Sequence, residues 1–144
     1  MKERRNKNRG YMQLIVWQDA VQYFQLTCEE FSKPTFERAK LYSQQLASVD
    51  SVHRNIAEGY CRRSIREYLQ YLNFALGSLG ESVSAQFAYR RTEELSEKRF
   101  EELDALAYKI ENGLLRLIES LERKRNQGDW VETLIVEESN AAYR

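Results

Sequence analysis

Few residues in this sequence have the side chains and spacing that catalysis or metal binding needs. The chain contains one histidine, His53, and no Glu-x-x-His pair, whereas a di-iron site in a helical protein uses such a pair on two of its helices. Cys28 and Cys61 form no CxxC motif, which argues against a disulfide framework and against a zinc site. Arg62 and Arg63 follow Cys61 directly and could lower the pKa of its thiol. Because no convincing base accompanies Cys61, we expect an ordinary small side chain there.

The sequence also lacks the short motifs of common enzyme classes. It has no glycine-rich phosphate loop, no HExxH and no GxSxG. These motifs supply the phosphate cradle, the zinc ligands and the serine nucleophile of the enzymes that contain them. We therefore expect a protein that is not an enzyme, with no catalytic residue, no metal and no cofactor. For His53 we expect a partly buried or interfacial position.

Two short stretches are unusual for helices that only fill a core. The first is the junction NIAEGYCRRS at residues 55–64, and the second is GSLGE at residues 77–81. A glycine inside a helix costs about 1 kcal/mol relative to alanine, so two glycines within four residues imply that another helix approaches closely. Ser78, Ser82 and Ala85 would extend this shallow face. We expect the two glutamates to bond freed backbone N–H groups or an arginine. Structural or interface roles fall to six residues: Asn55, Glu58, Gly59, Gly77, Gly80 and Glu81.

Apolar residues recur at alternating spacings of three and four residues in three long segments, as expected when a helix buries one stripe. A weaker stripe between residues 46 and 56 indicates a further helix. The three strong stripes are Leu14, Trp17, Val21, Phe24, Cys28 and Phe31; Leu69, Leu72, Leu76, Leu79, Val83 and Phe87; and Phe100, Leu103, Ala107, Ile110, Leu114, Leu117 and Leu121.

Capping residues mark the ends of these helices. Pro34 ends the first helix, because the residue before a proline avoids helical geometry, and Thr35 can cap the second. We expect Gly59 to end the second helix as a left-handed C-terminal cap. Ser64 begins a capping-box sequence that places the start of the third helix, and Ser96 opens the fourth.

Short connections between long helices force neighbouring helices to run antiparallel. The sequence therefore predicts an all-α protein, an antiparallel up-down-up-down four-helix bundle. We place a basic N-terminal arm at residues 1–11, the bundle at residues 12–125, and an acidic and apolar tail at residues 126–144. No apolar run reaches the roughly 18 residues that a membrane span needs, and no signal peptide is recognisable. We expect a cytoplasmic protein with no membrane partner.

The charges balance overall but not locally. The chain has 22 lysines and arginines and 22 aspartates and glutamates, so its bulk charge does not predict nucleic-acid binding. Residues 1–10 carry five basic side chains, and residues 129–138 carry four acidic ones. Such ends are either solvated or, for the basic arm, contact phosphates or another subunit. An apolar patch in the tail fits weak docking on its own bundle or docking on a partner. The helix dipole already explains the Arg123-Lys124-Arg125 end of the fourth helix.

The junction and the glycine stretch also carry a resemblance. NIAEG at residues 55–59, the following Arg63-Ser64 with Glu67, and ALGSLGE at residues 75–81 resemble the four-helix-bundle protein family encoded by intervening sequences in 23S rRNA genes. That family is similar in turn to the accessory proteins of diversity-generating retroelements. Trp17-x-x-Ala20 and the Lys33-Pro34-Thr35-Phe36 stretch extend the resemblance, which spans residues 12–122.

The resemblance implies a protomer that assembles into a homopentameric ring. It also implies binding to RNA or DNA, or to a reverse transcriptase working on nucleic acid, without catalysis of its own. Members of the family commonly carry an Arg-Arg pair in the second helix where this chain has Leu46-Ala47. The charge for phosphate contacts must then come from other arginines. The candidates are Arg54, Arg62, Arg63, Arg66, Arg90 and Arg91.

Two readings of these arginines stay open. In the first they bind nucleic acid, with Arg62 and Arg66 on one helical face if the third helix starts early enough, and with Tyr60 stacking on an unpaired base. In the second the protein is an interaction scaffold without direct nucleic-acid binding, for which a neutral net charge is natural. The arginines then pair with acidic residues of the fourth helix, which are Glu97, Glu101, Glu102 and Asp104.

Overall fold

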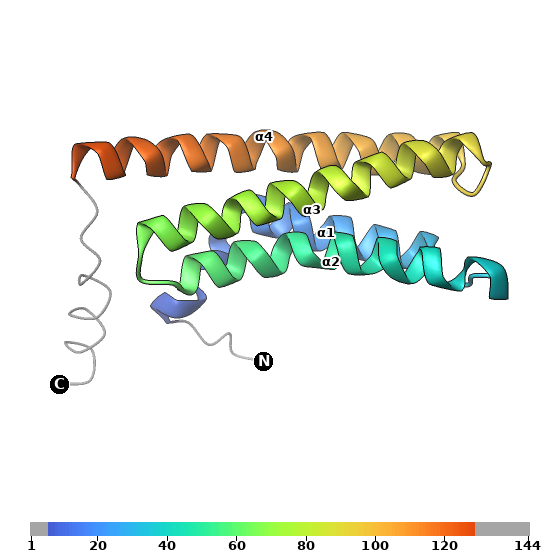
Figure 1. Cartoon of the computed structure of the whole chain (residues 1–144), viewed down its shortest axis with the longest axis horizontal. Coiled ribbons are helices and arrows are strands. Elements are labelled where there is room, and N and C mark those ends of the chain that lie inside the picture. The colour runs from blue at the N-terminus through green and yellow to red at the C-terminus, as the bar shows by residue number, and fades with distance from the viewer. Residues whose placement is uncertain (1–5, 129–144) are drawn as a thin grey trace.

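The computed structural model describes residues 6–128, and the predictions for residues 1–5 and for the tail from residue 129 onward lie outside this range. Within it the chain is entirely helical, as the sequence predicts, and contains no strand (Figure 1). Two 3-10 helices, η1 and η2, accompany four α-helices, α1 to α4. Their bounds are η1 Lys7–Gln13, α1 Ile15–Glu30, η2 Phe36–Arg38, α2 Ala39–Cys61, α3 Ile65–Arg91 and α4 Glu97–Gln127.

The four α-helices lie side by side and alternate in direction (Figure 1). Helix α1 packs on α2 and α4, and α3 packs on the same two helices. The alternation brings η1, the α2–α3 connection and the end of α4 together at the left of Figure 1. We call this half, residues 7–22, 51–77 and 113–127, the junction end. The other half, residues 23–50 and 78–112, is the far end. No helix among the described residues is long and apolar enough to cross a membrane.

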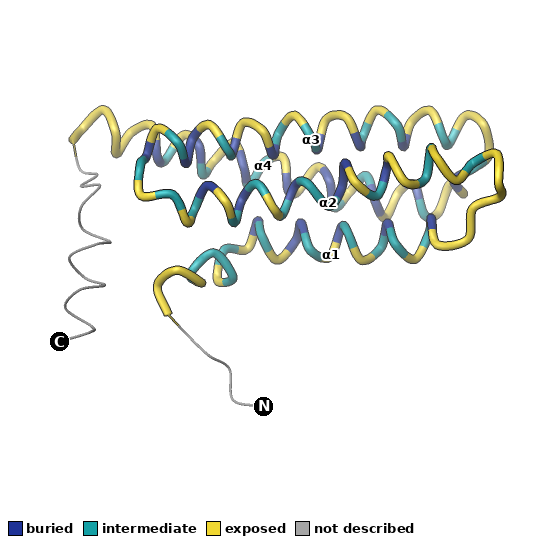
Figure 2. Tube along the Cα trace, turned by 60° about the horizontal axis from the view of Figure 1, so that its bottom comes forward, coloured by how far each residue is buried: buried dark blue, intermediate teal, exposed yellow. Residues whose placement is uncertain are grey.

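The buried residues (dark blue in Figure 2) lie where the helices face one another. The predicted stripe of α4 is buried except that Ile118 takes the place of Leu117. In α3, the prediction for Phe87 is wrong, since 44 % of its side chain is exposed. In α1 the buried stripe is shifted by one residue from the predicted one. Its members are Val16, Ala20, Tyr23 and Thr27, and Asp19 is buried beside them.

The α1 stripe includes polar residues because their polar groups are satisfied inside the protein. The Tyr23 hydroxyl lies 2.9 Å from Ser82 Oγ and accepts a hydrogen bond from Gln86 Nε2. The Thr27 hydroxyl donates to the Tyr23 carbonyl at 2.7 Å. Ser82 and Gln86 are themselves completely buried in α3. A paired polar group costs little to bury, so hydropathy alone points to the wrong face of α1.

Burial raises the pKa of Tyr23 to about 12, so stability should fall in alkaline solution. Between pH 10 and pH 12 the unfolded chain loses this proton while the folded chain keeps it. The free energy of unfolding should therefore decrease as pH rises through this window, by about 3 kcal/mol in total from this residue. Urea unfolding at pH 8 to 11.5 measures the decrease. Tyr23→Phe should be less stable at pH 8, because Gln86 loses its partner, yet show a shallower decline. An equal decline in both proteins would contradict the assignment to Tyr23.

Two of the predicted helix starts are confirmed by their hydrogen bonds. Ser64 Oγ accepts from the Glu67 backbone N–H at 3.3 Å, and Ser96 Oγ accepts from that of Arg99 at 3.2 Å. The prediction for Thr35 is wrong, because its side chain makes no capping bond and the short helix η2 separates it from α2. The first residues that the sequence assigned to the second helix therefore form η2, and α2 begins only at Ala39.

The prediction that Gly59 ends the second helix is also wrong. Helix α2 continues to Cys61, and the only described glycine with a left-handed backbone is Gly128, which caps α4 at φ 70°. Gly59 is required for a different reason, since α3 passes directly over it. A Cβ added at Gly59 would lie 2.9 Å from Tyr71 Cβ and 3.1 Å from the Tyr68 carbonyl oxygen. Gly59 therefore sets how closely α2 and α3 can approach.

Serines, rather than the two glycines of α3, form hydrogen bonds between α2 and α3. Ser51 Oγ lies 2.8 Å from Ser78 Oγ, and Ser48 Oγ donates to the Ser78 carbonyl at 3.1 Å. Asn55 steadies this arrangement from within α2 by donating to the Ser51 carbonyl and hydroxyl. The predicted close approach of another helix is thus present, because α2 contacts α3 at Ser78 and Ser82. The two glycines lie on a different face of α3.

Gly77 and Gly80 instead face outward from α3. Both are exposed, and a Cβ added at either would have no atom within 4 Å among those it could meet. The same outer face carries Phe74 and Phe87, which are 49 % and 44 % exposed. Glu81 is also exposed there and has no hydrogen-bond or ion-pair partner in the described part of the chain, so the expectation that it bonds a backbone N–H group or an arginine is wrong. No helix in the described part of the chain therefore accounts for the two glycines.

Candidate nucleic-acid interface

The six candidate arginines lie at two opposite ends of the molecule. Arg54, which belongs to α2, lies at the junction end, where Arg62, Arg63 and Arg66 surround the α2–α3 connection. The remaining pair, residues 90 and 91, ends α3 at the far end. Twenty-seven helical residues separate these ends, a length of about 40 Å at 1.5 Å per residue. The candidates therefore cannot form one continuous patch on a single protomer.

Arg62 is committed to the fold of the junction. Its guanidinium donates to Glu58 at 2.8 Å and to the Tyr71 hydroxyl at 3.0 Å, and it lies 3.5 Å from a Glu67 carboxylate oxygen. The hydrogen bond to Glu58 raises the pKa of Arg62. Arg62 follows α2 and has an extended backbone, so it belongs to no helix. The prediction that it shares a helical face with Arg66 is therefore wrong. The expectation that Glu58 pairs with an arginine is confirmed.

Two further candidates are also engaged. Arg54 Nε donates to Asp50, which accepts a second hydrogen bond from His53 Nε2 at 2.8 Å. Burial alone would raise the pKa of Asp50, but these two bonds outweigh it and hold the pKa below its usual value. Arg90 lies 3.5 Å from Glu97 and covers the rings of two phenylalanines, Phe87 and Phe100.

The other three candidates, Arg63, Arg66 and Arg91, are exposed and have no side-chain partner among the described residues. The alternative that the arginines pair with acidic residues of the fourth helix is correct only for Arg90. At the junction end this alternative fails, because the acidic residues of α4 lie mainly at the far end. Arg63 and Arg66 are therefore available for a partner.

The fold separates the charges that balance in the sequence. The junction end holds ten lysines and arginines and five acidic residues, whereas the far end holds eight lysines and arginines and twelve acidic residues. The excess at the junction end includes Lys7 and Arg9 of η1 and residues 123–125 of α4. In the sequence, the helix dipole alone explains residues 123–125. Their proximity to the junction follows from the alternating helix directions, so the topology was the signal that could have found them.

Helix η1 is fixed against the junction by small-residue packing. A Cβ at Gly10 would lie 2.0 Å from the Tyr60 hydroxyl, so any larger residue there would force the Tyr60 ring to move. The Tyr60 ring has edge contacts with Tyr11 and Tyr68, each with centroids 6.0 Å apart. Tyr60 is therefore packed against two rings of its own chain, and its stacking on an unpaired base stays a prediction.

His53 and Cys61 have structural surroundings. His53 is half-buried, as expected, with its ring beside Phe24 and its Nε2 on Asp50. Cys61 Sγ donates to the Asn8 carbonyl at 3.3 Å. Partial burial, followed by the nearby Glu58 carboxylate, raises the pKa of the Cys61 thiol, so the suggestion that its neighbouring arginines lower that pKa is wrong. Among residues 6–128, no group of three or more potential metal ligands occurs.

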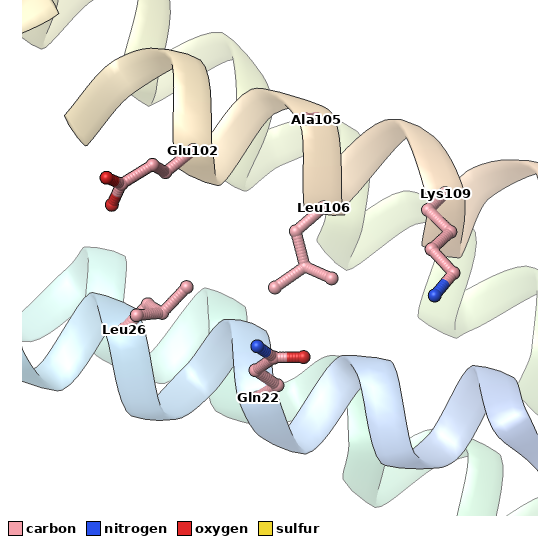
Figure 3. A pocket seen from close by; sticks show the side chains of 6 residues that line it. All are labelled: Gln22, Leu26, Glu102, Ala105, Leu106 and Lys109. Carbon is pink, nitrogen blue, oxygen red and sulfur yellow. The ribbon is translucent and has the colours of Figure 1, made fainter. Parts of the chain in front are cut away.

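A hollow of about 450 Å³ lies between α1 and α4, away from the basic junction (Figure 3). Leu26 and Leu106 point into it, with Gln22 and Lys109 at one side and Glu102 at the other. Glu102 is already bonded to Arg99 at 2.9 Å. The mixed charges and the position of this hollow make it a poor match for a polyanion.

These features define a small helical protein in which basic side chains outnumber acidic ones at one end of the described body. The sequence matches the family model described as 23S rRNA-intervening sequence protein over residues 12–116. The chain belongs to this family. No curated protein matches the chain. The relation to retroelement accessory proteins is not part of this match and stays a prediction.

Proposed function

We propose that the protein is a non-catalytic nucleic-acid-binding protein that acts through the phosphate backbone of RNA or DNA as an oligomeric ring of four-helix-bundle protomers. The observation that carries this proposal is the junction end, with its twofold excess of basic side chains and the unpaired Arg63 and Arg66. Lysines and arginines that neutralise phosphates supply most of the affinity for nucleic acid. The family description, which refers to 23S rRNA, fits an RNA partner.

Assembly into a ring, which the resemblance suggests as a pentamer, would multiply this charge. The outer face of α3 supports assembly, because Gly77 and Gly80 lie between two exposed phenylalanines and no atom of residues 6–128 packs against these two positions. Glycines at such positions let a second helix approach closely, which would offset the helix stability that they cost. In a ring, the junction end of each protomer would contribute to one repeated basic surface.

Replacing the two unpaired junction arginines tests the nucleic-acid role. Arg63→Ala/Arg66→Ala should lower the affinity for a labelled single-stranded RNA about tenfold or more at low salt. It should also flatten the slope of log affinity against log salt by about 1.4, or about 0.7 for each lost phosphate contact. Fluorescence anisotropy over a salt series measures both quantities.

Arg91→Ala is the matched control, because Arg91 is equally exposed and unpaired but lies at the far end. This variant should bind like the unchanged protein. An equal loss in the control would move the binding surface away from the junction. If the unchanged protein binds no RNA or DNA at low salt, the proposed function is wrong.

An interaction scaffold is the second candidate function. Phe36 in η2 favours it, since 95 % of this apolar side chain is exposed, at the end of the molecule opposite the basic junction. The resemblance suggests a reverse transcriptase as such a partner. A direct complex with that enzyme should survive nuclease treatment and be lost in Phe36→Ala, whereas a complex bridged by RNA should disappear with the RNA.

A further inference from the structure

A second feature of the junction end goes beyond charge. An open pocket of about 490 Å³ lies between η1, α1 and α2, which is within the size range of small-ligand pockets. Its walls include Tyr11, Trp17, His53 and Arg54, with Glu58 at one side. The neighbouring Tyr11 and Trp17 rings meet edge to face, with centroids 5.4 Å apart. An aromatic pocket beside a basic surface has the composition that proteins use to hold the bases of single-stranded nucleic acid.

The aromatic wall of the pocket is held in place from several directions. Gln18 Nε2 donates to the Met12 carbonyl at 2.9 Å, and Cys61 Sγ donates to that of Asn8, so η1 is attached to both α1 and α2. The tight fit of Gly10 against the Tyr60 hydroxyl fixes the residue next to Tyr11. Tyr11 is therefore presented on an anchored segment, which lowers the entropy lost when a ligand binds.

Arg54 supplies the charge at this pocket. Its side chain is 72 % exposed, and Asp50 bonds its Nε only, so both terminal nitrogens have no partner in the described structure. Asp50 is held in turn by His53, which fixes the position of the guanidinium. Two free nitrogens on a fixed guanidinium suit a phosphate oxygen pair.

The polar groups inside the pocket favour a base over a phosphate there. Glu58 would repel a phosphate group, and only one of its carboxylate oxygens is used, by Arg62. A base offers ring nitrogens, carbonyl oxygens and amino groups to such a site, while its phosphate stays outside near Arg54.

We propose that this pocket receives one unpaired base of a single-stranded nucleic acid, with Tyr11 and Trp17 as its aromatic wall and Arg54 at the adjoining phosphate. The inference rests on the proposed nucleic-acid function and deepens it. It gives the protein a preference for single strands or bulges over continuous duplex, because a base inside a duplex is paired and stacked and cannot enter. Arg63 and Arg66 contact backbone in both forms and supply no such preference.

The test compares one labelled RNA as a single strand and as a blunt duplex, at low salt, with the full-length protein. We expect the single strand to bind more tightly, and we expect Tyr11→Ala to weaken that binding about tenfold while leaving duplex affinity unchanged. Tyr108→Ala, which removes a tyrosine that is 66 % exposed on α4, should change neither affinity. A second readout is 2-aminopurine placed in the single strand, whose fluorescence should be quenched by the unchanged protein and recover in Tyr11→Ala.

The outcomes separate this inference from the proposed function. Equal affinity of the unchanged protein for both forms would overturn the pocket and leave backbone binding intact. An equal loss of single-strand and duplex affinity in Tyr11→Ala would also overturn the pocket and leave backbone binding intact. Arg54→Gln, a surface substitution that leaves η1 in place, should also weaken the single strand selectively. Its failure to do so would overturn the phosphate contact. Binding of neither form would refute the proposed function itself.

Discussion

Gly59→Ala should lower the free energy of unfolding by about 2 kcal/mol, although alanine is intrinsically the better helix former. The added methyl group would lie 3.0 Å from Tyr68 Cδ1 and 3.1 Å from the Tyr68 carbonyl oxygen. The side-chain atom can rotate away, but the carbonyl belongs to the backbone of α3. Relief therefore requires α2 and α3 to separate, which also stretches the serine contacts between them. Urea unfolding followed by circular dichroism measures the change.

Gly77→Ala is the matched control for this prediction. Both residues lie inside long helices, yet a Cβ at Gly77 would contact none of the described residues. This substitution should raise the stability of the protomer by about 1 kcal/mol, the ordinary gain of alanine over glycine. Opposite signs for the two substitutions would establish that Gly59 acts through packing. A stabilising Gly59→Ala would show that α3 yields easily and would contradict the close contact.

The helices could be predicted from the sequence because periodic apolar residues and capping side chains act locally. Ser64 and Ser96 cap their helices as their positions indicate, and six of the seven predicted stripe positions in α4 are buried. The face of α1 could not be predicted in this way. Tyr23 and Thr27 are buried there only because α3 and the backbone supply hydrogen-bond partners, and those partners are defined by tertiary structure.

The candidate site was predictable in composition but not in arrangement. The sequence identified the junction arginines. It did not predict that Arg62 bonds Glu58 and Tyr71 while Arg63 stays unpaired. It treated Gly59 as a helix terminator, because a left-handed cap and a close helix contact both select glycine. It also selected Tyr60 for stacking but not Tyr11 and Trp17, which the fold brings to the wall of an open pocket. Each error concerns which neighbour the fold supplies.

The outer face of α3 offers the sharpest test of assembly. Gly77→Ala/Gly80→Ala should raise protomer stability by about 2 kcal/mol, because both positions are helical and open. The same two methyl groups would hold a neighbouring protomer's helix away from this face, so the dissociation constant of the assembly should increase at least tenfold. Sedimentation velocity over a concentration series measures the assembly, and denaturation in the dilute, dissociated state measures the protomer.

Opposite changes in the two quantities cannot come from damage to the fold, since a damaged protomer loses both stability and assembly. Glu111→Ala, an exposed change on α4, should leave assembly unaltered and controls for surface substitution in general. Unchanged assembly in the double variant would exclude this face as the contact and leave its two glycines without a packing role. A protein that sediments as a monomer at every concentration would rule out the ring, while the junction end of each protomer would still carry the charge on which nucleic-acid binding depends.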